Sequence, residues 1–534
     1  MQKQENSRRP LILSIAGFLM NIIINYNAIV LRRIIMDVKK NIERLQDNIE
    51  KRYVLQHAMT VLSYDAETVM PAGGGDRFGE TMGALAEMQY GLLVNDEFRS
   101  LMKELLEQKK DLPIHLQREV EELHRTLKQI EVIPVEEYSA FESAQAHAGV
   151  AWRKAKDGND WEMFRPHLEK LLEYAVRFKR YYDAKAPIYD LMLDDYEHGL
   201  NAEMLDGFFA TLREELVPLI HEIAEKPQPD ISFLQKDYPP HIQEKLARWL
   251  MEVMTLDPEY CSLGQTEHPF TTSVSNKDVR ITTHYYTEAP LSSVFSVIHE
   301  GGHALYMMHT ADELNGLSLA EGASCSIHES MSRFMENIIG RSEAFTVFLL
   351  PKLQELFPEQ MQGVDAKQLW LACNRAEPSL IRVEADELTY PLHIMVRYEL
   401  EKRMVSGELA VSDLPEEWNR LYKEYLGVDI PDDSHGVLQD MHWSDASFGY
   451  FPTYALGSAY SAQILAAMEK DLDVWGLVGR GEFRPLVEWL TEKLYRFGGV
   501  KTASQLIQDI CGEPFDPHYY MDYLKTKYRK VYGL

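Results

Sequence analysis

Apolar residues recur at spacings of three and four through most of the chain after residue 36, which is the pattern of amphipathic helices. The clearest segments are EFRSLMKELLEQ, HLQREVEELHRTLKQIEV and MFRPHLEKLLEYAVRFKRYYDA, at residues 97–108, 115–132 and 163–184. The chain shows no fixed-period repeat, no low-complexity tract and no long linker of glycine and serine. The sequence therefore predicts a mostly α-helical protein.

A different pattern occupies residues 270–286, FTTSVSNKDVRITTHYY, where β-branched and aromatic residues partly alternate with polar ones. This pattern predicts one or two short strands, and the edge of such a strand can hold an extended peptide through main-chain hydrogen bonds. Prolines in EKPQPDISF (225–233) and DYPPHIQ (237–243) indicate turns, and suggest a hinge between a helical part at 36–260 and a second part at 261–534.

The first 35 residues are unusual because PLILSIAGFLMNIIINYNAIVL, residues 10–31, is apolar and has basic residues on both sides. A signal peptide would need a cleavage site of small residues, which is missing. A membrane anchor at residues 10–30 is long enough, but Asn21, Asn25 and Asn27 weaken it. The sequence favours an overlong start with Met36 opening the folded protein, then an anchor, and lastly a signal peptide.

Composition and charge exclude several classes of protein. The net charge of -28 argues against binding to nucleic acid or to anionic membrane surfaces. The four cysteines are widely separated and form no C-x-x-C pair, which suits a reducing cytoplasm and offers no thiolate metal site. We therefore expect a cytoplasmic protein, or a membrane-anchored one only if residues 10–30 are a genuine anchor.

Candidate chemistry lies in SVFSVIHEGGHALYMMH, residues 293–309, which contains His299-Glu300-x-x-His303. On a helix this spacing places both imidazoles on one face, where they can bind one zinc ion, while the glutamate can polarise a bound water molecule. A chain with 18 histidines among 534 residues contains such a motif by chance about once in twenty, so its surroundings must support it.

The surroundings favour a helix with a functional middle. Val294, Val297, Ile298 and Leu305 lie on an apolar side, and Pro290 marks a plausible start. Two glycines follow the glutamate, and each costs a helix about 1 kcal/mol relative to alanine. We expect this cost where a substrate backbone or another element comes close.

Two histidines leave a catalytic zinc ion one protein ligand short, besides the open position for water. The next predicted helix is CSIHESMSRFMENIIG, residues 325–340, in which Glu329 and Glu336 lie opposite the apolar stripe. Glu321 is a third candidate. Spacing alone leaves open which of them binds metal, and also whether Glu329 and Glu336 are simply solvated surface charges.

Six further stretches resemble, in order, the motifs of the M32 family of metallocarboxypeptidases, over about residues 36–534. They are SYDAETVMP from 63, HPF from 268, DVRIT from 278, HES from 328, IRVEAD from 381 and GVLQDMHW from 436, and HEGGH from 299 falls in its place among them. The chain departs from the family pattern at Tyr64, where tryptophan is usual, and at Met331, where glutamine is usual.

The resemblance implies a mostly α-helical, two-lobed metallopeptidase of the gluzincin type, with a deep groove and a small β-sheet beside the zinc helix. It implies Glu329 as the third ligand, completing a site of His299, His303 and Glu329 for one Zn²⁺ per subunit, with Co²⁺ as an alternative. It also implies a homodimer and peptide substrates with a free C-terminus.

Metal-assisted hydrolysis gives Glu300 the role of general base, which takes a proton from water and passes it to the leaving amine. His442, which lies in one of the family motifs, and Tyr450 and Tyr454, which follow it, are candidates for stabilising the oxyanion. The tyrosines lie in an aromatic-rich run, DMHWSDASFGYFPTY, of a kind that often packs a core instead.

An exopeptidase must also bind the substrate's C-terminal carboxylate, which a guanidinium does with two hydrogen bonds. Arg280 and Arg382 lie in family motifs whose arginines close the groove, and we expect Asp278 and Asp386 to orient them. The sequence therefore predicts a zinc carboxypeptidase that removes single C-terminal residues, with a related zinc oligopeptidase or dipeptidyl carboxypeptidase as the alternative.

Overall fold

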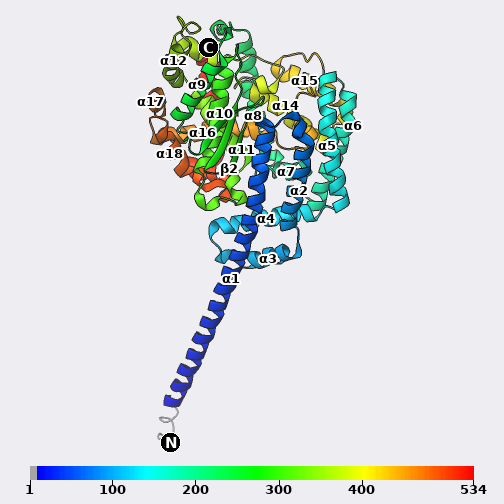
Figure 1. Cartoon of the computed structure of the whole chain (residues 1–534), viewed down its shortest axis with the longest axis vertical. Helices are drawn as coiled ribbons and strands as arrows, with labels where there is room; N and C mark the ends of the chain where they lie inside the picture. Colours follow the sequence, from blue (N-terminus) through cyan, green and yellow to red (C-terminus); the bar gives the residue numbers. More distant parts are fainter. Residues whose placement is uncertain (1–8) are drawn as a thin grey trace. The chain divides into compact units, whose positions relative to one another are not determined.

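The structure is a computed structural model, which describes the backbone from Arg9 to Leu534 and the side chains from Met36 onward (Figure 1). Helices dominate it and one small sheet accompanies them, which confirms the predicted fold class. The alternatives for residues 1–35 fall on side chains outside the described part. Within the described part, no helix combines the length and the apolar character needed to cross a membrane.

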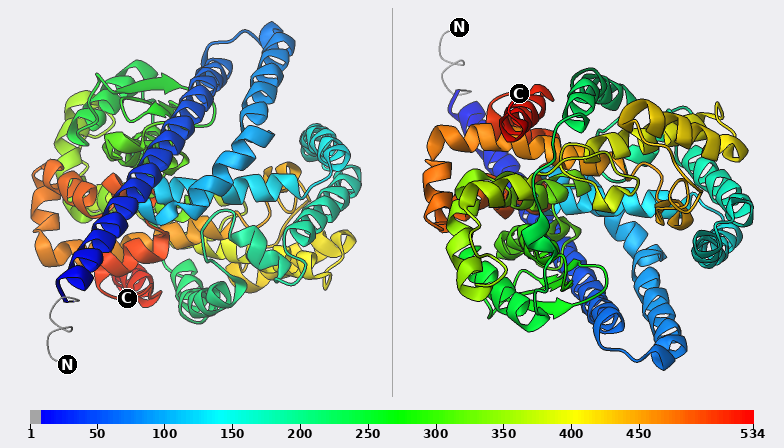
Figure 2. Two further views of the ribbon diagram at one scale, coloured as in Figure 1. Left: turned by 90° about the horizontal axis from the view of Figure 1, so that it is seen from below. Right: turned by 90° about the horizontal axis from the view of Figure 1, so that it is seen from above.

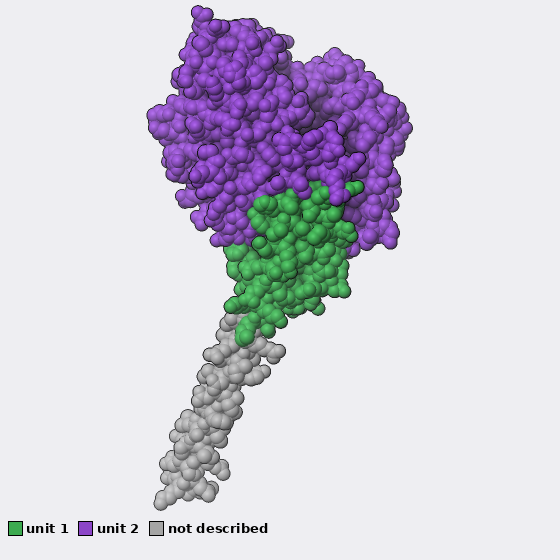
Figure 3. All heavy atoms as spheres, in the orientation of Figure 1, with its two compact units in different colours: residues 1–59, 79–127 green, residues 60–78, 128–534 purple. Residues whose placement is uncertain are grey.

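The chain forms two compact units, which Figure 3 distinguishes by colour. One unit consists of residues 1–59 and 79–127, and the other of residues 60–78 and 128–534. The first unit contains α3 and most of three other helices: α1 (Arg9–Thr68), α2 (Gly75–Leu93), α3 (Asp96–Glu107) and α4 (Ile114–Glu131). The proposed division after residue 260 lies inside the second unit and stays a prediction.

The second unit holds the remaining α-helices of the described part. Those that precede the sheet are α5 (Val135–Gly158), α6 (Trp161–Tyr182), α7 (Ile188–Leu193), α8 (Ala202–Ala224) and α9 (Pro240–Val253). Those that follow the sheet are α10 (Pro290–His309), α11 (Cys325–Arg333), α12 (Glu343–Leu356), α13 (Ala366–Cys373), α14 (Tyr390–Ser406), α15 (Leu414–Leu426), α16 (Pro452–Asp471), α17 (Val474–Gly479), α18 (Arg484–Lys493), α19 (Ala503–Cys511) and α20 (His518–Tyr532).

The three segments with the clearest helical pattern form α3, α4 and α6, as predicted. Each buries its apolar side chains, and α3 and α6 begin at an Asn or Asp side chain that accepts a hydrogen bond from the first turn. The proline-rich stretches lie between α8 and α9, where Pro240 is the first residue of α9. Hydrophobic periodicity was thus sufficient to locate these helices.

The sheet has three strands, one more than the sequence pattern predicts. The predicted region forms β2 (Thr271–Ser275) and β3 (Asp278–Thr283), which pair antiparallel. The additional strand, β1 (Cys261–Gln265), pairs parallel with β3, so β3 is central and β2 is an edge strand. The sequence of β1, CSLGQ, contains no β-branched or aromatic residue, which explains why the pattern missed it.

Helix α10 lies against β2 and β3, as the green ribbons of Figure 2 show. It begins at Pro290 as predicted, and all of its predicted apolar side is buried. Helix α10 also packs against α11, so it contacts both the sheet and a second helix. This placement fixes the helix that contains the His-Glu-x-x-His motif.

The predicted helix at residues 325–340 has two parts. It is α-helical over α11, but the segment Phe334–Gly340 is a π-helix. A π-helix advances each residue less far around the axis than an α-helix does, and such segments are frequent at functional sites. Two of the candidate metal ligands therefore lie in different kinds of helix, because Glu329 belongs to α11 and Glu336 belongs to the π-helix.

Candidate metal centre and active site

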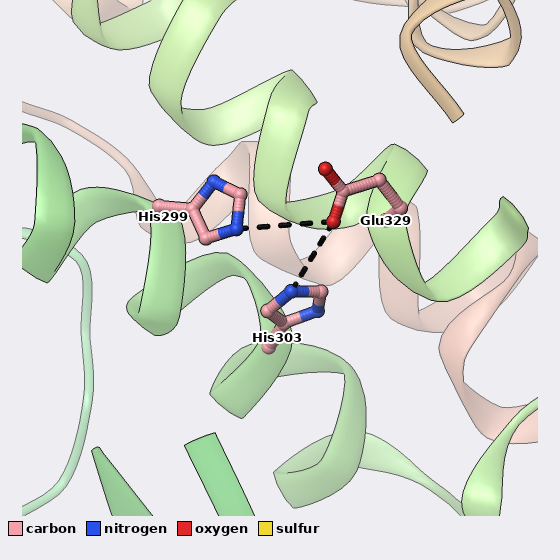
Figure 4. A group of neighbouring side chains, drawn as sticks. All are labelled: His299, His303 and Glu329. Carbon is pink, nitrogen blue, oxygen red and sulfur yellow. Dashed lines mark ion pairs between the residues drawn. The ribbon is translucent and has the colours of Figure 1, made fainter. Parts of the chain in front are cut away.

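Three candidate metal ligands converge between α10 and α11 (Figure 4). His299 and His303 lie one turn apart on α10, and Glu329 faces them from α11. The Oε2 atom of Glu329 lies 3.8 Å from Nε2 of His299 and 3.6 Å from Nε2 of His303. Within the described part of the chain, this is the one group of histidine, cysteine or acidic side chains with such spacing.

These distances suit a tetrahedral metal ion. Two ligand atoms that each lie about 2.0–2.2 Å from such an ion are roughly 3.3–3.6 Å apart. The observed separations exceed this range by only about 0.2 Å or less, which a small rotation of side chains removes. Two imidazoles and one carboxylate form a donor set that suits zinc and leaves a fourth position open.

Each histidine has a partner on its far ring nitrogen. Nδ1 of His299 lies 2.9 Å from Oε2 of Glu336, and because a carboxylate only accepts, this nitrogen must hold the proton. Nδ1 of His303 lies 2.6 Å from Nδ1 of His328. Burial lowers the pKa of His328 to about 3, so its ring is neutral. Nδ1 of His328 can therefore accept a hydrogen bond from a proton on Nδ1 of His303. Both Nε2 lone pairs are then directed toward Glu329.

Glu329 is buried and remains ionised. Burial by itself raises the pKa of a carboxyl, but neighbouring groups, of which the charge of Arg333 has the largest effect, outweigh it and hold the pKa of Glu329 well below its usual range. Nε of Arg333 donates to Oε1 of Glu329 over 2.7 Å, while Oε2, which also accepts from Oγ of Ser332 over 3.1 Å, faces the two imidazoles. Glu329 is 7% exposed and Glu336 is 8% exposed, so the reading of both as solvated surface charges is wrong.

Glycines bring the backbones of α10, α11 and α16 close to one another. A Cβ atom on Gly302 would lie 2.5 Å from the carbonyl oxygen of Met331 and 2.7 Å from Cα of Ser332, both on α11. A Cβ atom on Gly457, on α16, would lie 2.8 Å from Cβ of Glu329. Gly302 therefore allows α11 to approach α10 closely. Close approach of another element was one of the two predicted reasons for a glycine in this helix.

A cavity of about 480 Å³ opens beside the three ligands, and Glu300 lines it with them. The Oγ1 hydroxyl of Thr271 donates to Oε2 of Glu300 over 2.6 Å, so the edge strand β2 holds this carboxylate in place. Glu300 is 7% exposed and has one oxygen fixed by the threonine. The carboxylate is thus ordered next to the space where a substrate would lie.

Two of the three predicted oxyanion donors line the same cavity, and the third, His442, contacts one of them. Tyr450 and Tyr454 line it, and the Oη atom of Tyr454 lies 3.3 Å from Nε2 of His442. Burial raises the pKa of both tyrosines well above the ordinary value, so both phenols keep their protons. Burial also lowers the pKa of His442 to about 4, which leaves its ring neutral near pH 7. These groups are therefore neutral hydrogen-bond donors.

The two predicted arginines lie outside the wall of this cavity. Arg280, on β3, is paired with Asp278 as predicted, with Nε and Nη2 each 2.8 Å from a carboxylate oxygen. Its guanidinium lies 5.1 Å from the centre of the Tyr64 ring, at the position where the family usually has tryptophan. Arg382 lies behind Tyr454, with the guanidinium 5.1 Å from the centre of that ring.

The predicted partner of Arg382 is wrong. Its guanidinium pairs with Asp440, with Nε 2.9 Å and Nη2 2.8 Å from Oδ1, and not with Asp386. The Asp386 carboxylate instead accepts hydrogen bonds from the backbone just before α14, where it fixes the turn. The other oxygen of Asp440 pairs with Arg397, which is completely buried. Two guanidinium groups and one carboxylate therefore leave one net positive charge behind Tyr454.

Sequence reasoning missed four residues that support the site. Glu336 was considered only as a metal ligand, and its role is to hold His299. His328 and Arg333 flank Glu329 in the sequence, so their spacing on α11 was a signal. Asp440 lies two residues before His442 within a family motif, but its arginine partners come from distant segments. No local pattern could have revealed that last contact.

We expect replacement of Glu329 by glutamine to lower metal affinity by about 100-fold, because a charged ligand becomes a neutral amide. Glu336→Gln removes only the partner of His299, and should weaken binding by roughly tenfold, the lower end for such outer partners. Competition titration with a metal indicator measures both. Glu321→Gln is the matched control and should bind normally. Full affinity in Glu329→Gln together with a loss in either of the other variants would contradict this ligand set.

Comparison with known proteins agrees with this geometry. A family model described as carboxypeptidase Taq (M32) metallopeptidase matches residues 44–528. Carboxypeptidase 1 of Bacillus subtilis is 38% identical over 479 residues, which cover 89% of this chain and 96% of that protein. Thermostable carboxypeptidase 1 of Pyrococcus furiosus is 34% identical over 493 residues, which cover 92% of this chain and 98% of that protein.

A solved structure shows the same fold. The M32 carboxypeptidase from Deinococcus radiodurans matches with a TM-score of 0.90 and 31% sequence identity, and the match covers 93% of this chain and all of that chain. The agreement of sequence and fold over nearly the full length of these relatives leaves one assignment. The chain belongs to the M32 family of metallocarboxypeptidases.

Proposed function

We propose that this metallocarboxypeptidase uses zinc, removes single residues from the C-terminus of peptides, and employs Glu300 as its general base. The observation that carries the proposal is the cluster of His299, His303 and Glu329 with Glu300 beside it in one cavity. The sequence predicts the same set, and the family assignment supplies the reaction class.

The donor set supports zinc as the metal, with cobalt as the alternative, because imidazole and carboxylate ligands suit both ions. When bound, such an ion would lower the pKa of a water molecule and polarise the scissile carbonyl group. The contacts of Glu336 with His299, and of His328 with His303, orient the imidazoles for this role.

Glu300 would take a proton from the attacking water molecule and deliver it to the leaving amine. Two features support this role. The hydrogen bond from Thr271 fixes Oε2 of Glu300, and the residue follows a predicted metal ligand directly in the sequence. Glu329 already interacts with Arg333, so Glu300 is the better placed carboxylate for proton transfer.

The substrate backbone would extend along β2. This strand lies at the edge of the sheet, begins at Thr271 and so runs beside Glu300. An edge strand presents unpaired backbone groups that hold an extended peptide. Tyr450 and Tyr454, which line the cavity, would donate hydrogen bonds to the oxyanion, and the neutral His442 would support them through its contact with Tyr454.

The C-terminal carboxylate would be attracted to the end of the cavity near Tyr454. The buried group of Arg382, Arg397 and Asp440 has one net positive charge there. Arg382 has donors that Asp440 does not use, and it is the preferred of the two predicted arginines. Arg280 is the alternative partner for the C-terminal carboxylate. Its hydrogen bond with Asp278 fixes the orientation of its guanidinium.

Assembly and location follow from the sequence alone. The resemblance to the M32 family supports a homodimer, and the four free cysteines are compatible with the reducing cytoplasm. Measuring the oligomeric state in solution tests the homodimer, and cell fractionation tests the cytoplasmic location.

Mass analysis of peptide products tests the proposed function. Zinc-loaded enzyme should shorten a peptide with a free C-terminus one residue at a time, and a chelator should stop the reaction. The same peptide with an amidated C-terminus should be spared, while acetylation of its N-terminus should matter little. Internal fragments or dipeptides, or equal cleavage of the amidated peptide, would instead indicate an oligopeptidase or a dipeptidyl carboxypeptidase.

A further inference from the structure

The cavity beside the metal site has an excess of acidic groups. Glu300, Glu321 and Glu329 line it, whereas no lysine or arginine does among the described residues. Two of these carboxylates have partners, because Glu329 pairs with Arg333 and Glu300 accepts a hydrogen bond from Thr271. The third, Glu321, has no hydrogen bond or ion pair within the described part of the chain.

The backbone next to Glu321 packs against α10. It is the last residue of the short helix Ser318–Glu321, and Gly322 follows it with a φ of 95°. A Cβ atom on Gly322 would lie 2.9 Å from the ring of Tyr306, and the Tyr306 hydroxyl accepts a hydrogen bond of 3.0 Å from the backbone of Ala323. The backbone that follows Glu321 therefore packs closely on α10, and the exposed Glu321 side chain extends from it at the cavity.

The same part of the cavity offers apolar contacts. Met307 from α10 and Cys325 from the start of α11 line it together with Glu321. A lysine or arginine side chain has an apolar stem and a charged end, and it binds well where an apolar surface leads to a carboxylate. Glu321 is exposed to solvent where it lines the cavity, so its carboxylate is open to such a cation.

The position of Glu321 relative to the metal site indicates which residue of the substrate it faces. Helices α10 and α11 run antiparallel, since His299 contacts Glu336 near one end and His303 contacts His328 near the other. Glu321 lies beyond His328, at the start of α11. The positive group with Arg382 lies beyond the opposite end, because Arg333 and Arg382 both contact the ring of Tyr390.

We propose that Glu321 is a specificity-determining residue, which binds a lysine or arginine side chain at the penultimate position of the substrate. This proposal rests on the proposed function, in which the C-terminal carboxylate lies toward Arg382. The C-terminal residue then occupies that side of the metal site, and the residue before the scissile bond occupies the side of Glu321. The enzyme thereby prefers peptides with a basic penultimate residue.

A set of peptides that differ in one position tests the proposal. The peptides of the first set share one C-terminal residue and have lysine, glutamine or glutamate before it. The peptides of the second set share one penultimate residue and have lysine, glutamine or glutamate at the C-terminus. The enzymes are the wild type, Glu321→Gln, Glu321→Lys and the control Glu313→Gln, which changes an exposed glutamate in the same region outside the cavity. Metal content is measured for each variant, and kcat/KM for each peptide.

We expect the wild type to cleave the penultimate-lysine peptide about five- to tenfold more efficiently than the glutamine peptide, and the glutamate peptide less efficiently than either. Added salt should reduce this preference. Glu321→Gln should abolish the preference with normal metal content, Glu321→Lys should reverse it, and Glu313→Gln should keep it.

Three outcomes would overturn the inference. Equal cleavage of all three penultimate peptides by the wild type would do so, as would a preference that persists in Glu321→Gln. A charge preference confined to the C-terminal residue would show that Glu321 faces the other side of the scissile bond. Failure of the proposed function is distinguishable, because the zinc-loaded wild type would then release no single C-terminal residue from any peptide.

Discussion

Replacing Glu300 by glutamine is expected to lower kcat by about 10²–10⁴-fold while leaving metal binding intact. Glutamine has nearly the same shape and can still accept the hydrogen bond from Thr271, so the fold around the site should persist. It cannot accept a proton from water, which is the step assigned to Glu300. Steady-state kinetics on a peptide, together with metal analysis of the same sample, measures both expectations.

The matched control removes the hydrogen bond that supports Glu300 and keeps the Glu300 carboxylate. Thr271→Val deletes the hydroxyl that donates to Glu300, and it should reduce kcat by roughly tenfold or less, because the proton-accepting group is still present. Glu300 would have no role as a base if Glu300→Gln turned over near the wild-type rate. A loss of metal in Glu300→Gln would mean that the residue supports the ligands instead.

The sequence was sufficient for the parts of the site that lie close together along the chain. The one-turn spacing of His299 and His303 and the apolar side of their helix depend only on helical periodicity, and both appear in the structure. Glu329 needed the resemblance to the M32 family, since Glu336 satisfied the same helical pattern and Glu321 was a third candidate. The structure separates the three by contact, because Glu329 alone faces both imidazoles.

Contacts between distant segments could not be predicted in this way. From the sequence we expect Asp386, four residues after Arg382, to orient this arginine, yet Asp440 lies 58 residues away and forms the ion pair. The π-helix Phe334–Gly340 was missed because a change in helical pitch leaves no mark in the hydrophobic pattern. Strand β1 was missed because its pairing with β3 compensates for a composition that does not favour strands.

Asp440→Asn is expected to lower the free energy of unfolding by about 3–5 kcal/mol. Asp440 bridges Arg382 and Arg397, whose side chains are only 7% and 0% exposed. Burial alone would raise the pKa of this carboxyl, but the charges of Arg397 and Arg382 hold it well below the usual range, so Asp440 is ionised. Asparagine keeps the shape and removes the charge, which leaves two buried guanidinium groups uncompensated.

Unfolding in guanidinium chloride, followed by tryptophan fluorescence, measures this change, and Trp418 is a local probe because Arg397 lies 4.5 Å from the centre of its ring. The control is Asp429→Asn, which removes an ion pair with Lys423 on a carboxylate that is 85% exposed. It should cost less than about 1 kcal/mol. Equal effects of the two substitutions would contradict the assigned role of Asp440.

A double variant separates charge from packing as the cause. If uncompensated charge destabilises Asp440→Asn, then adding Arg397→Met should recover part of the stability, because methionine fills a similar volume without a charge. If the lost stability instead comes from packing, the second substitution should add its own cost, since Arg397 also stacks on Trp418 and donates to the His393 carbonyl oxygen. The motif GVLQDMHW would then contain two separable functions. Asp440 balances the buried charge behind the cavity, and His442 from the same short segment contacts Tyr454, which lines the cavity.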